Sequence, residues 1–267
     1  MTWHLGMLCA LDFESTGVDV ETARIVTACV AWIDGSGKKE PVIRQWLIDP
    51  GIPIPEEAAK IHGITTEHAQ KHGRAHFDAL PEIVAELRSA MPSVPIVGHN
   101  VGSYDLNLLD RECRRHGIEP LPEASPVIDT LVLDKHLVKY RKGTGARRLT
   151  TLCETYGVRL DGAHDATYDA LASARIAWKM GARNPRLAAL SLPELHELQK
   201  RAAKHQDQDY AIYLRGLGNK ARTADEQIEL WTRADQIDAA AGYWPVSPYT
   251  KAAAAETATA DTTTTPF

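Results

Sequence analysis

Paired cysteines, excess positive charge and long apolar runs are the features that this sequence lacks. Its four cysteines (Cys9, Cys29, Cys113 and Cys153) stand far apart with no C-x-x-C pair, which argues against a structural zinc site or a disulfide framework. No apolar run reaches the length of a transmembrane helix, and residues 1–6 lack the charged and apolar regions of a signal peptide. We therefore expect a cytoplasmic protein without a membrane segment, whose cysteines are mostly buried as small apolar residues.

The scarcity of positive charge limits how the chain could bind a polyanion. It has 30 Lys and Arg against 35 Asp and Glu, a formal net charge of −5. This balance argues against a protein that coats nucleic acid by bulk electrostatics. A phosphate-rich substrate would have to be held locally, by metal ions or a small basic patch. The 267 residues suffice for one large α/β domain with an appendage or for two small domains.

Two carboxylates stand out in the stretch 8–17, which reads LCALDFESTG. Its apolar start predicts a buried strand, and side chains two residues apart on a strand share a face. Asp12 and Glu14 should therefore project together, with Phe13 on the other side. Carboxylates held side by side repel each other unless a divalent cation lies between them. Alone, D-x-E is a weak signal, because acidic pairs are common at strand ends.

Strands and helices alternate along the following chain. The segments 7–11, 25–33 and 42–48 predict an antiparallel meander, and 95–98 and 126–130 predict two further short strands. Amphipathic segments between and after these strands predict helices over 56–61, 78–91, 105–116, 131–138, 149–156 and 166–180. Strands that alternate with helices after an opening meander predict a mixed α/β sheet.

The pattern changes beyond about residue 184. Capping-box sequences at Ser191–Glu194 and Thr223–Glu226 predict helices that end near Leu214 and Ala240. Residues 251–267 are rich in Ala and Thr and have no core-forming pattern, so we expect them to be disordered. We accordingly divide the chain into a main domain (1–183), a C-terminal helical extension (184–249) and a tail (250–267).

Two more carboxylates lie at the starts of predicted helices. Asp105 lies at the start of the helix 105–116, and Asp169 lies early in the helix 166–180. His164 comes five residues before Asp169, which would place the two about 140° apart on a single helix. They can converge if the helix begins near Asp165 and His164 lies on the preceding loop.

Three segments containing these residues resemble the motifs of one family. They read LDFESTG, GHNVGSYDLNLLDREC and AHDATYDALASA, in that order, and IHGIT at 61–65 adds a fourth likeness. Together they resemble the DEDD superfamily of 3′–5′ exonucleases, in its His-containing (DEDDh, DnaQ-like) branch. The resemblance covers about residues 7–180. It implies an RNase H-like fold with a mixed five-stranded sheet flanked by helices, and it leaves the C-terminal helices unexplained.

The resemblance also implies a site and a reaction. Two Mg²⁺ (or Mn²⁺) ions would be held by Asp12, Glu14, Asp105 and Asp169, and His164 would deprotonate the attacking water. Hydrolysis would release nucleoside 5′-monophosphates from a 3′ end. The residues expected to hold the terminal nucleotide are Ser15, Thr16, Gly17, His62 and Asn100. Tyr104 replaces a Phe that is common in the family, and we expect it to pack in the same way.

Several alternatives stay open at this point. Single-stranded or frayed DNA is the favoured substrate, with trimming of RNA 3′ ends or non-catalytic binding of nucleic-acid ends as alternatives. The C-terminal helices could dock a DNA polymerase or pair two chains. We expect the basic loop 139–148 to contact the nucleic-acid backbone. We interpret Asp129 and Asp134 as solvated surface carboxylates, whereas His99 is as easily a structural histidine as a ligand.

Overall fold

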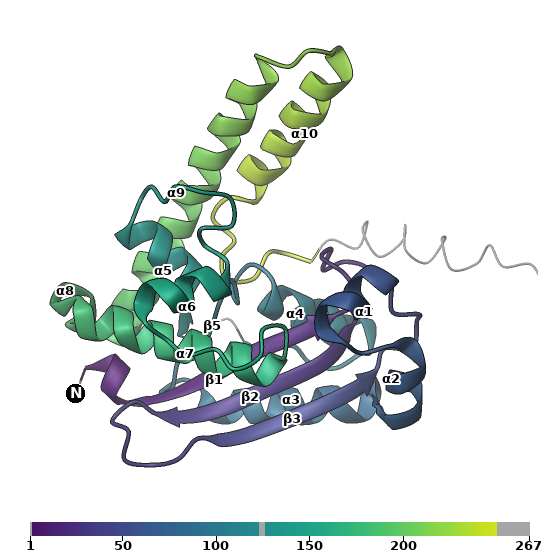
Figure 1. Cartoon of the computed structure of the whole chain (residues 1–267), viewed down its shortest axis with the longest axis vertical. Coiled ribbons are helices and arrows are strands. Elements are labelled where there is room, and N and C mark those ends of the chain that lie inside the picture. The colour runs from purple at the N-terminus through teal and green to yellow at the C-terminus, as the bar shows by residue number, and fades with distance from the viewer. Residues whose placement is uncertain (1, 123–125, 250–267) are drawn as a thin grey trace, which may run out of the picture.

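A six-stranded sheet organises the computed structural model, which describes residues 2–122 and 126–249 (Figure 1). The strand order is β4-β3-β2-β1-β5-β6. Strands β1 (Met7–Ser15), β2 (Ile25–Asp34) and β3 (Val42–Asp49) form the antiparallel meander. The predicted disordered tail lies outside the described residues.

Parallel pairing extends the sheet on both sides of the meander. Strand β5 (Ile96–Gly98) pairs with β1, and β6 (Val127–Asp129) pairs with β5. The predicted α/β fold with a mixed sheet is therefore confirmed, with one addition to the expected five strands. The sixth strand, β4 (Arg74–Ala75), pairs with β3, and two residues are too few to produce a sequence period.

The helices follow the predicted order, with small shifts at their ends. They are α1 (Glu56–His62), α2 (Thr66–His72), α3 (His76–Ala90), α4 (Asp105–Arg115), α5 (Thr130–Leu137), α6 (Leu149–Tyr156), α7 (Ala166–Arg183), α8 (Pro185–Ala188), α9 (Leu192–Gly218) and α10 (Ala224–Ala240). The short helix α8 and the 3₁₀ turn η1 (Trp3–Leu5) were not predicted. Gly63 ends α1 with a positive φ, and the Thr65 side chain caps α2.

Alternation along β1 separates two cores. Cys9 and Leu11 face the core on the side of α3 and α4, whereas Leu8 and Ala10 face the core on the side of α6 and α7. All four cysteines are buried, although only most of them were expected to be. The alternation matters for the site, because the next even-numbered residues on the α7 face are the two carboxylates of β1.

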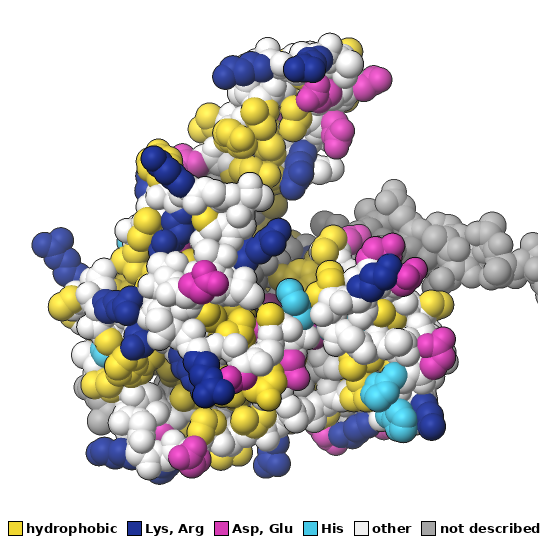
Figure 2. Space-filling view, viewed as in Figure 1, with side chains coloured by type: hydrophobic (Ala, Val, Ile, Leu, Met, Phe, Trp, Pro, Cys, Tyr) yellow, Lys and Arg dark blue, Asp and Glu magenta, His cyan; other side chains and the backbone are white. Residues whose placement is uncertain are grey.

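Helices α9 and α10 form an antiparallel pair that projects from the body of the molecule (Figure 1). The capping box at Ser191 is complete. The second is half formed, because Thr223 caps the backbone of Glu226, while the Glu226 carboxylate accepts from Arg222. Apolar side chains gather on one exposed face of this pair (Figure 2).

Among the described residues, none of the helices combines the length and the apolar character that a membrane span needs. The division into domains stays a prediction.

Candidate active site

Asp12 and Glu14 lie at the end of β1, in a row that continues the α7 face of the sheet. Their strand partners on β2 are Cys29 and Thr27. A register shift follows between Glu14 and Ser15, where the strand ends and the chain turns. The two carboxylates are half-buried. Their placement on one face agrees with the period-two argument from the sequence.

Asp105 reaches the same strand from the first turn of α4. Its Oδ1 accepts a hydrogen bond of 3.0 Å from the backbone N–H of Phe13, the residue between the two carboxylates of β1. Asp105 is almost fully buried, with 4% of its surface exposed. Its position at a helix N-terminus provides some stabilisation of a negative charge. This hydrogen bond fixes Asp105 to β1 at Phe13, 92 positions earlier in the chain.

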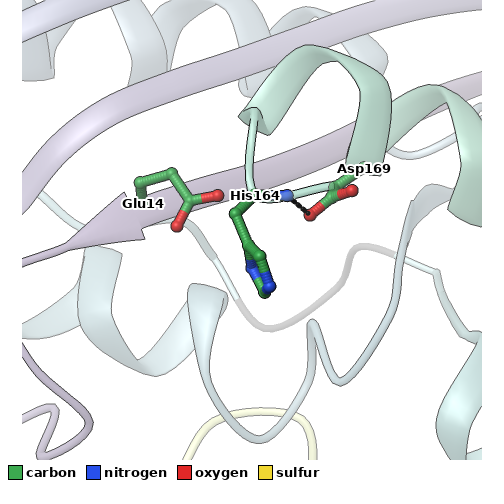
Figure 3. A group of neighbouring side chains, drawn as sticks. All are labelled: Glu14, His164 and Asp169. Atoms are coloured by element: carbon green, nitrogen blue, oxygen red, sulfur yellow. Dashed lines mark hydrogen bonds between the residues drawn. The ribbon is translucent and has the colours of Figure 1, made fainter. Parts of the chain in front are cut away.

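His164 and Asp169 enter from α7. The helix begins at Ala166 with Asp165 as its N-cap, so His164 lies on the preceding loop, as the spacing argument required. The backbone N–H of His164 donates to Asp169 Oδ2 over 3.1 Å. His164 has a φ of 64°, a conformation that non-glycine residues seldom adopt and that concentrates at functional sites. Its imidazole is exposed and faces the same space as Glu14 and Asp169 (Figure 3).

Burial and mutual repulsion raise the pKa of all four carboxylates. The pKa of Asp12 lies well above its usual value because of burial and the nearby charges of Asp105, Asp169, Glu14 and Asp165. Burial is the main cause for the others as well. It raises the pKa of Glu14 to about 7, that of Asp105 to about 8 and that of Asp169 to about 6. Such a cluster is costly without positive charge.

The carboxylate oxygens fit a hard divalent cation, with His164 beside them. Ligand atoms of Glu14, His164 and Asp169 lie within 4.8 Å of one another. Asp169 Oδ1 is buried and has no hydrogen-bond partner among the described residues. Carboxylate oxygens are the ligands that Mg²⁺ and Mn²⁺ prefer. A cation would satisfy the unpaired oxygen and offset the repulsion in the same place.

The turn after β1 is tied together by hydroxyl groups. Ser15 Oγ donates to the carbonyl of Gly17 over 2.8 Å, and the Tyr104 hydroxyl hydrogen bonds to both residues. Tyr104 therefore does more than the packing expected of it. Thr16 is buried, and its Oγ1 already accepts from the N–H of Arg24 at 2.9 Å. Its role in gripping a sugar hydroxyl stays a prediction.

His62 and Asn100 have different surroundings. His62 Nδ1 accepts from the Ile64 N–H over 3.2 Å, and its Nε2 is buried without a partner among the described residues. Burial lowers the pKa of His62, with smaller effects from Ser15 and His164, which places it beside the site. Asn100 has a φ of 65° and donates its backbone N–H to Asp129 Oδ1 at 3.0 Å. Its backbone shapes the loop before α4.

Two expectations about other acidic residues were wrong. Asp129 and Asp134 are fully buried, not solvated. Asp129 caps α5 and also accepts from the N–H of Gly102 at 3.0 Å. Asp134 accepts from the Tyr156 hydroxyl at 2.9 Å and from the guanidinium groups of Arg141 and Arg147. A buried carboxylate is stable when hydrogen bonds and opposite charge surround it.

The basic loop 139–148 is consequently less free than expected. Arg141 and Arg147 bind Asp134, which leaves less positive charge for a nucleic-acid backbone. His99 is a structural histidine. Its Nε2 donates to the carbonyl of Arg147 over 3.0 Å, and its Nδ1 lies 2.9 Å from Thr130 Oγ1.

Asp165 is the acidic neighbour that sequence reasoning passed over. Its side chain caps α7 by accepting from the Thr167 N–H at 2.9 Å, and its charge raises the pKa of Asp12, Glu14 and Asp169. The available signal was its position directly before a predicted helix, where Asp is a preferred N-cap.

Comparison with known proteins adds a family and several relatives. Residues 9–177 match the sequence model of the RNase T family, which is described as exonuclease. A segment of DNA polymerase III PolC-type from Pediococcus pentosaceus is 30% identical over 166 residues, covering 61% of this chain and 10% of that protein. The corresponding protein of Lacticaseibacillus paracasei is 33% identical with the same coverage. The chain thus spans about a tenth of the length of these curated relatives.

Solved structures share the fold. Escherichia coli exonuclease I in complex with a dT13 oligonucleotide is 20% identical, with a TM-score of 0.59, covering 68% of this chain and 42% of that one. The moderately thermophilic exonuclease I of Methylocaldum szegediense is also 20% identical, with a TM-score of 0.56, covering 78% and 46%. These similarities confirm the RNase H-like exonuclease fold.

Proposed function

Because the chain belongs to the RNase T family of DnaQ-like exonucleases, we propose that it is a metal-dependent 3′–5′ exonuclease acting on single-stranded or frayed DNA. It would release nucleoside 5′-monophosphates. The similarity to a segment of DNA polymerase III PolC-type and the fold shared with exonuclease I support DNA as the substrate. Docking of a DNA polymerase or a second chain on the C-terminal helices stays a prediction.

One observation carries the proposal. Carboxylates from three distant segments, on β1, α4 and α7, meet at one end of the sheet, and an exposed histidine lies beside them. Stabilisation of the fold alone would not favour this arrangement, because the carboxylates raise one another's pKa. It is favoured if the site must hold cations against a phosphodiester.

Each residue has a distinct part in this proposal. Asp12, Glu14, Asp105 and Asp169 would hold two Mg²⁺ or Mn²⁺ ions, which when bound supply an activated water and charge stabilisation at the phosphate. His164 would accept the proton of the attacking water, a task suited to imidazole near neutral pH. The hydrogen bond from the His164 backbone to Asp169 keeps this loop beside α7.

The terminal nucleotide would be held by the turn and by α1. Ser15, Thr16 and Gly17 lie next to the carboxylates of β1, and His62 faces them from the end of α1. Asn100 would contribute from the loop before α4. Because Thr16 Oγ1 already accepts a hydrogen bond, it can still donate its hydroxyl proton to a sugar oxygen.

A degradation assay tests this function. Single-stranded DNA labelled at its 5′ end is incubated with the protein and either Mg²⁺ or EDTA, and RNA of the same sequence is treated in parallel. We expect a ladder that shortens stepwise from the 3′ end in Mg²⁺ only, with mononucleotide 5′-phosphates identified by chromatography.

The matched control is Asp12→Asn protein purified in the same way, which identifies contaminating nuclease. Faster shortening of RNA would favour the RNA-trimming alternative. Retention of intact oligonucleotide in the presence of EDTA, without shortening in Mg²⁺, would contradict catalysis and favour a binding module.

A further inference from the structure

The chain returns to the main body after α10, and this return segment (residues 243–249) lies against α4. Asn107 on α4 donates to the carbonyl of Pro245 over 3.1 Å, and its Oδ1 accepts from both the N–H and the hydroxyl of Ser247 at 2.8 Å. Arg111 donates to the carbonyls of Ser247 and Pro248 at 3.0 and 3.3 Å. The return segment is therefore attached to the helix that begins with Asp105.

The same segment also contacts the loop before α4. Trp244 is buried against Gly102, three residues before Asp105. The fit is tight, because a Cβ added at Gly102 would lie 2.1 Å from Trp244 Nε1. The carbonyl of Gly102 accepts from Asn107 at 2.9 Å, and its N–H donates to Asp129 at 3.0 Å. Gly102 is thus held by Trp244, by α4 and by β6.

The start of the extension is fixed to the same region. Gln199 on α9 is fully buried. Its Oε1 accepts from the backbone N–H of Asp129 at 2.7 Å, and its Nε2 donates to the carbonyl of Val127 at 2.8 Å. Asp129 in turn binds the loop through Asn100 and Gly102. Both ends of the α9–α10 hairpin therefore meet at the loop that leads into Asp105.

We propose that the return segment is a positioning element of the active site, with Trp244 and Ser247 fixing the loop 100–104 and the start of α4 so that Asp105 stays against Phe13. This inference rests on the proposed function only in calling the site catalytic. Positioning residues act through the group that they orient, and losing one typically costs about 10–100-fold in metal affinity or activity.

A double-mutant cycle in the full chain tests the contact. Gly102→Ala pushes a methyl group into the indole, so we expect it to raise the dissociation constant for Mn²⁺ by about 10-fold, measured by electron paramagnetic resonance of free Mn²⁺. Trp244→Ala should weaken binding as well. In the Trp244→Ala background the added methyl meets no indole, so its further effect should be small, and the two changes should be strongly non-additive.

A matched control lies in the hairpin. Trp231 covers Gly218 in the same manner, since a Cβ at Gly218 would lie 2.6 Å from its ring. Gly218→Ala and Trp231→Ala should leave Mn²⁺ affinity unchanged. Additive effects of the first pair, or equal losses from the control pair, would overturn the proposal.

Hydrogen exchange provides a readout that needs neither metal nor substrate. Amides of residues 99–108 should exchange faster in Trp244→Ala, while those of β2 and β3 should not change. If Trp244→Ala does not fold, as judged by circular dichroism, Ser247→Ala serves instead, since it removes one hydrogen bond to Asn107 and one from Arg111. Unchanged exchange at 99–108 in a folded variant would refute positioning.

Nuclease assays distinguish the proposed exonuclease function from the proposed positioning of Asp105 by the return segment. Displacement of Asp105 should lower kcat for single-stranded DNA more than it raises KM, because contacts to the nucleotide remain. If the wild-type protein degrades no oligonucleotide, the proposed function fails, while Mn²⁺ binding and exchange still decide whether the return segment positions Asp105.

Discussion

Buried carboxylates occur in two contrasting settings in this molecule. Asp134 is surrounded by Tyr156, Arg141 and Arg147. Burial alone would raise its pKa, but these hydrogen bonds and positive charges prevail and hold the pKa of Asp134 below its usual value. At the end of β1 the pKa of Asp12 is instead raised by burial and by other carboxylates.

The difference separates acidic residues that stabilise the fold from those that we propose to be functional. The protein supplies arginines to Asp134, whereas Asp12 is surrounded by other carboxylates and Asp169 Oδ1 has no hydrogen-bond partner among the described residues. Charge that a fold does not neutralise by itself is available for a ligand. Substitutions in the two settings should therefore have opposite consequences for stability and activity.

The largest effect is expected from Asp12→Asn. Losing one carboxylate of a cation site removes several kcal/mol of transition-state stabilisation, and about 4 kcal/mol corresponds to about a 10³-fold loss of kcat. The metal-free variant should nevertheless be more stable than the wild type, since one source of repulsion is gone. Single-turnover degradation of labelled DNA and thermal unfolding in EDTA measure the two quantities. If Asp12→Asn loses both activity and stability, Asp12 does not lie among carboxylates that repel it in the metal-free protein.

Asp134→Asn should show the opposite pattern. Two arginines would lose their buried counter-ion, and breaking such a pair costs about 3 kcal/mol of unfolding free energy. Urea denaturation measures this loss, and kcat well below the unfolding temperature should stay near wild type. The matched control is Asp161→Asn, because the exposed ion pair of Asp161 with Arg159 should contribute less than about 1 kcal/mol. Equal losses in both variants would show that burial does not distinguish them.

His164→Ala separates proton transfer from metal binding. The imidazole is exposed beside the cluster, so its removal should leave Mn²⁺ affinity nearly intact and slow hydrolysis at least ~100-fold, the usual contribution of a general base. His68→Ala, at an exposed histidine on α2, is the control for nonspecific effects. Full activity in His164→Ala would remove this residue from the mechanism.

Local patterns predicted where the candidate site residues lie better than they predicted the contacts that hold those residues in place. Helical geometry required His164 to lie on the loop before α7 if it was to meet Asp169, and the common face of Asp12 and Glu14 followed from strand alternation. Both arguments need only near neighbours in the sequence. The hydrogen bond between Phe13 and Asp105 spans 92 positions, and only the order of the family motifs suggested that these segments meet.

Long-range polar contacts explain what the sequence did not reveal. Asp134 was expected at the surface because carboxylates are seldom fully buried, and the loop that holds its partner Arg141 was expected to contact nucleic acid instead. Asp129 precedes a helix, which is an N-cap signal, but its second bond to Gly102 depends on strand pairing. The return segment was equally hidden, since nothing near Trp244 in the sequence points to Gly102.

The smallest expected effect is the change in stability of the metal-free protein with pH. The pKa values of Glu14, Asp105 and Asp169 are raised to about 7, 8 and 6 in the folded state, against about 4 for unfolded carboxyl groups. Their stabilising contribution is complete below about pH 4 and is lost as the pH rises towards 8.

Half-buried histidines whose pKa is lowered by desolvation, such as His62 and His116, act in the opposite direction over part of this range. The informative quantity is therefore the difference between wild type and Glu14→Gln, in which the histidines are the same. In EDTA we expect the unfolding temperature of the variant to exceed that of the wild type increasingly from pH 5 to pH 8. In saturating Mn²⁺ at pH 8, the wild type should instead have the higher unfolding temperature, because a bound cation stabilises the ionised wild-type cluster. A constant difference across this range would mean that Glu14 does not titrate within a repelling cluster.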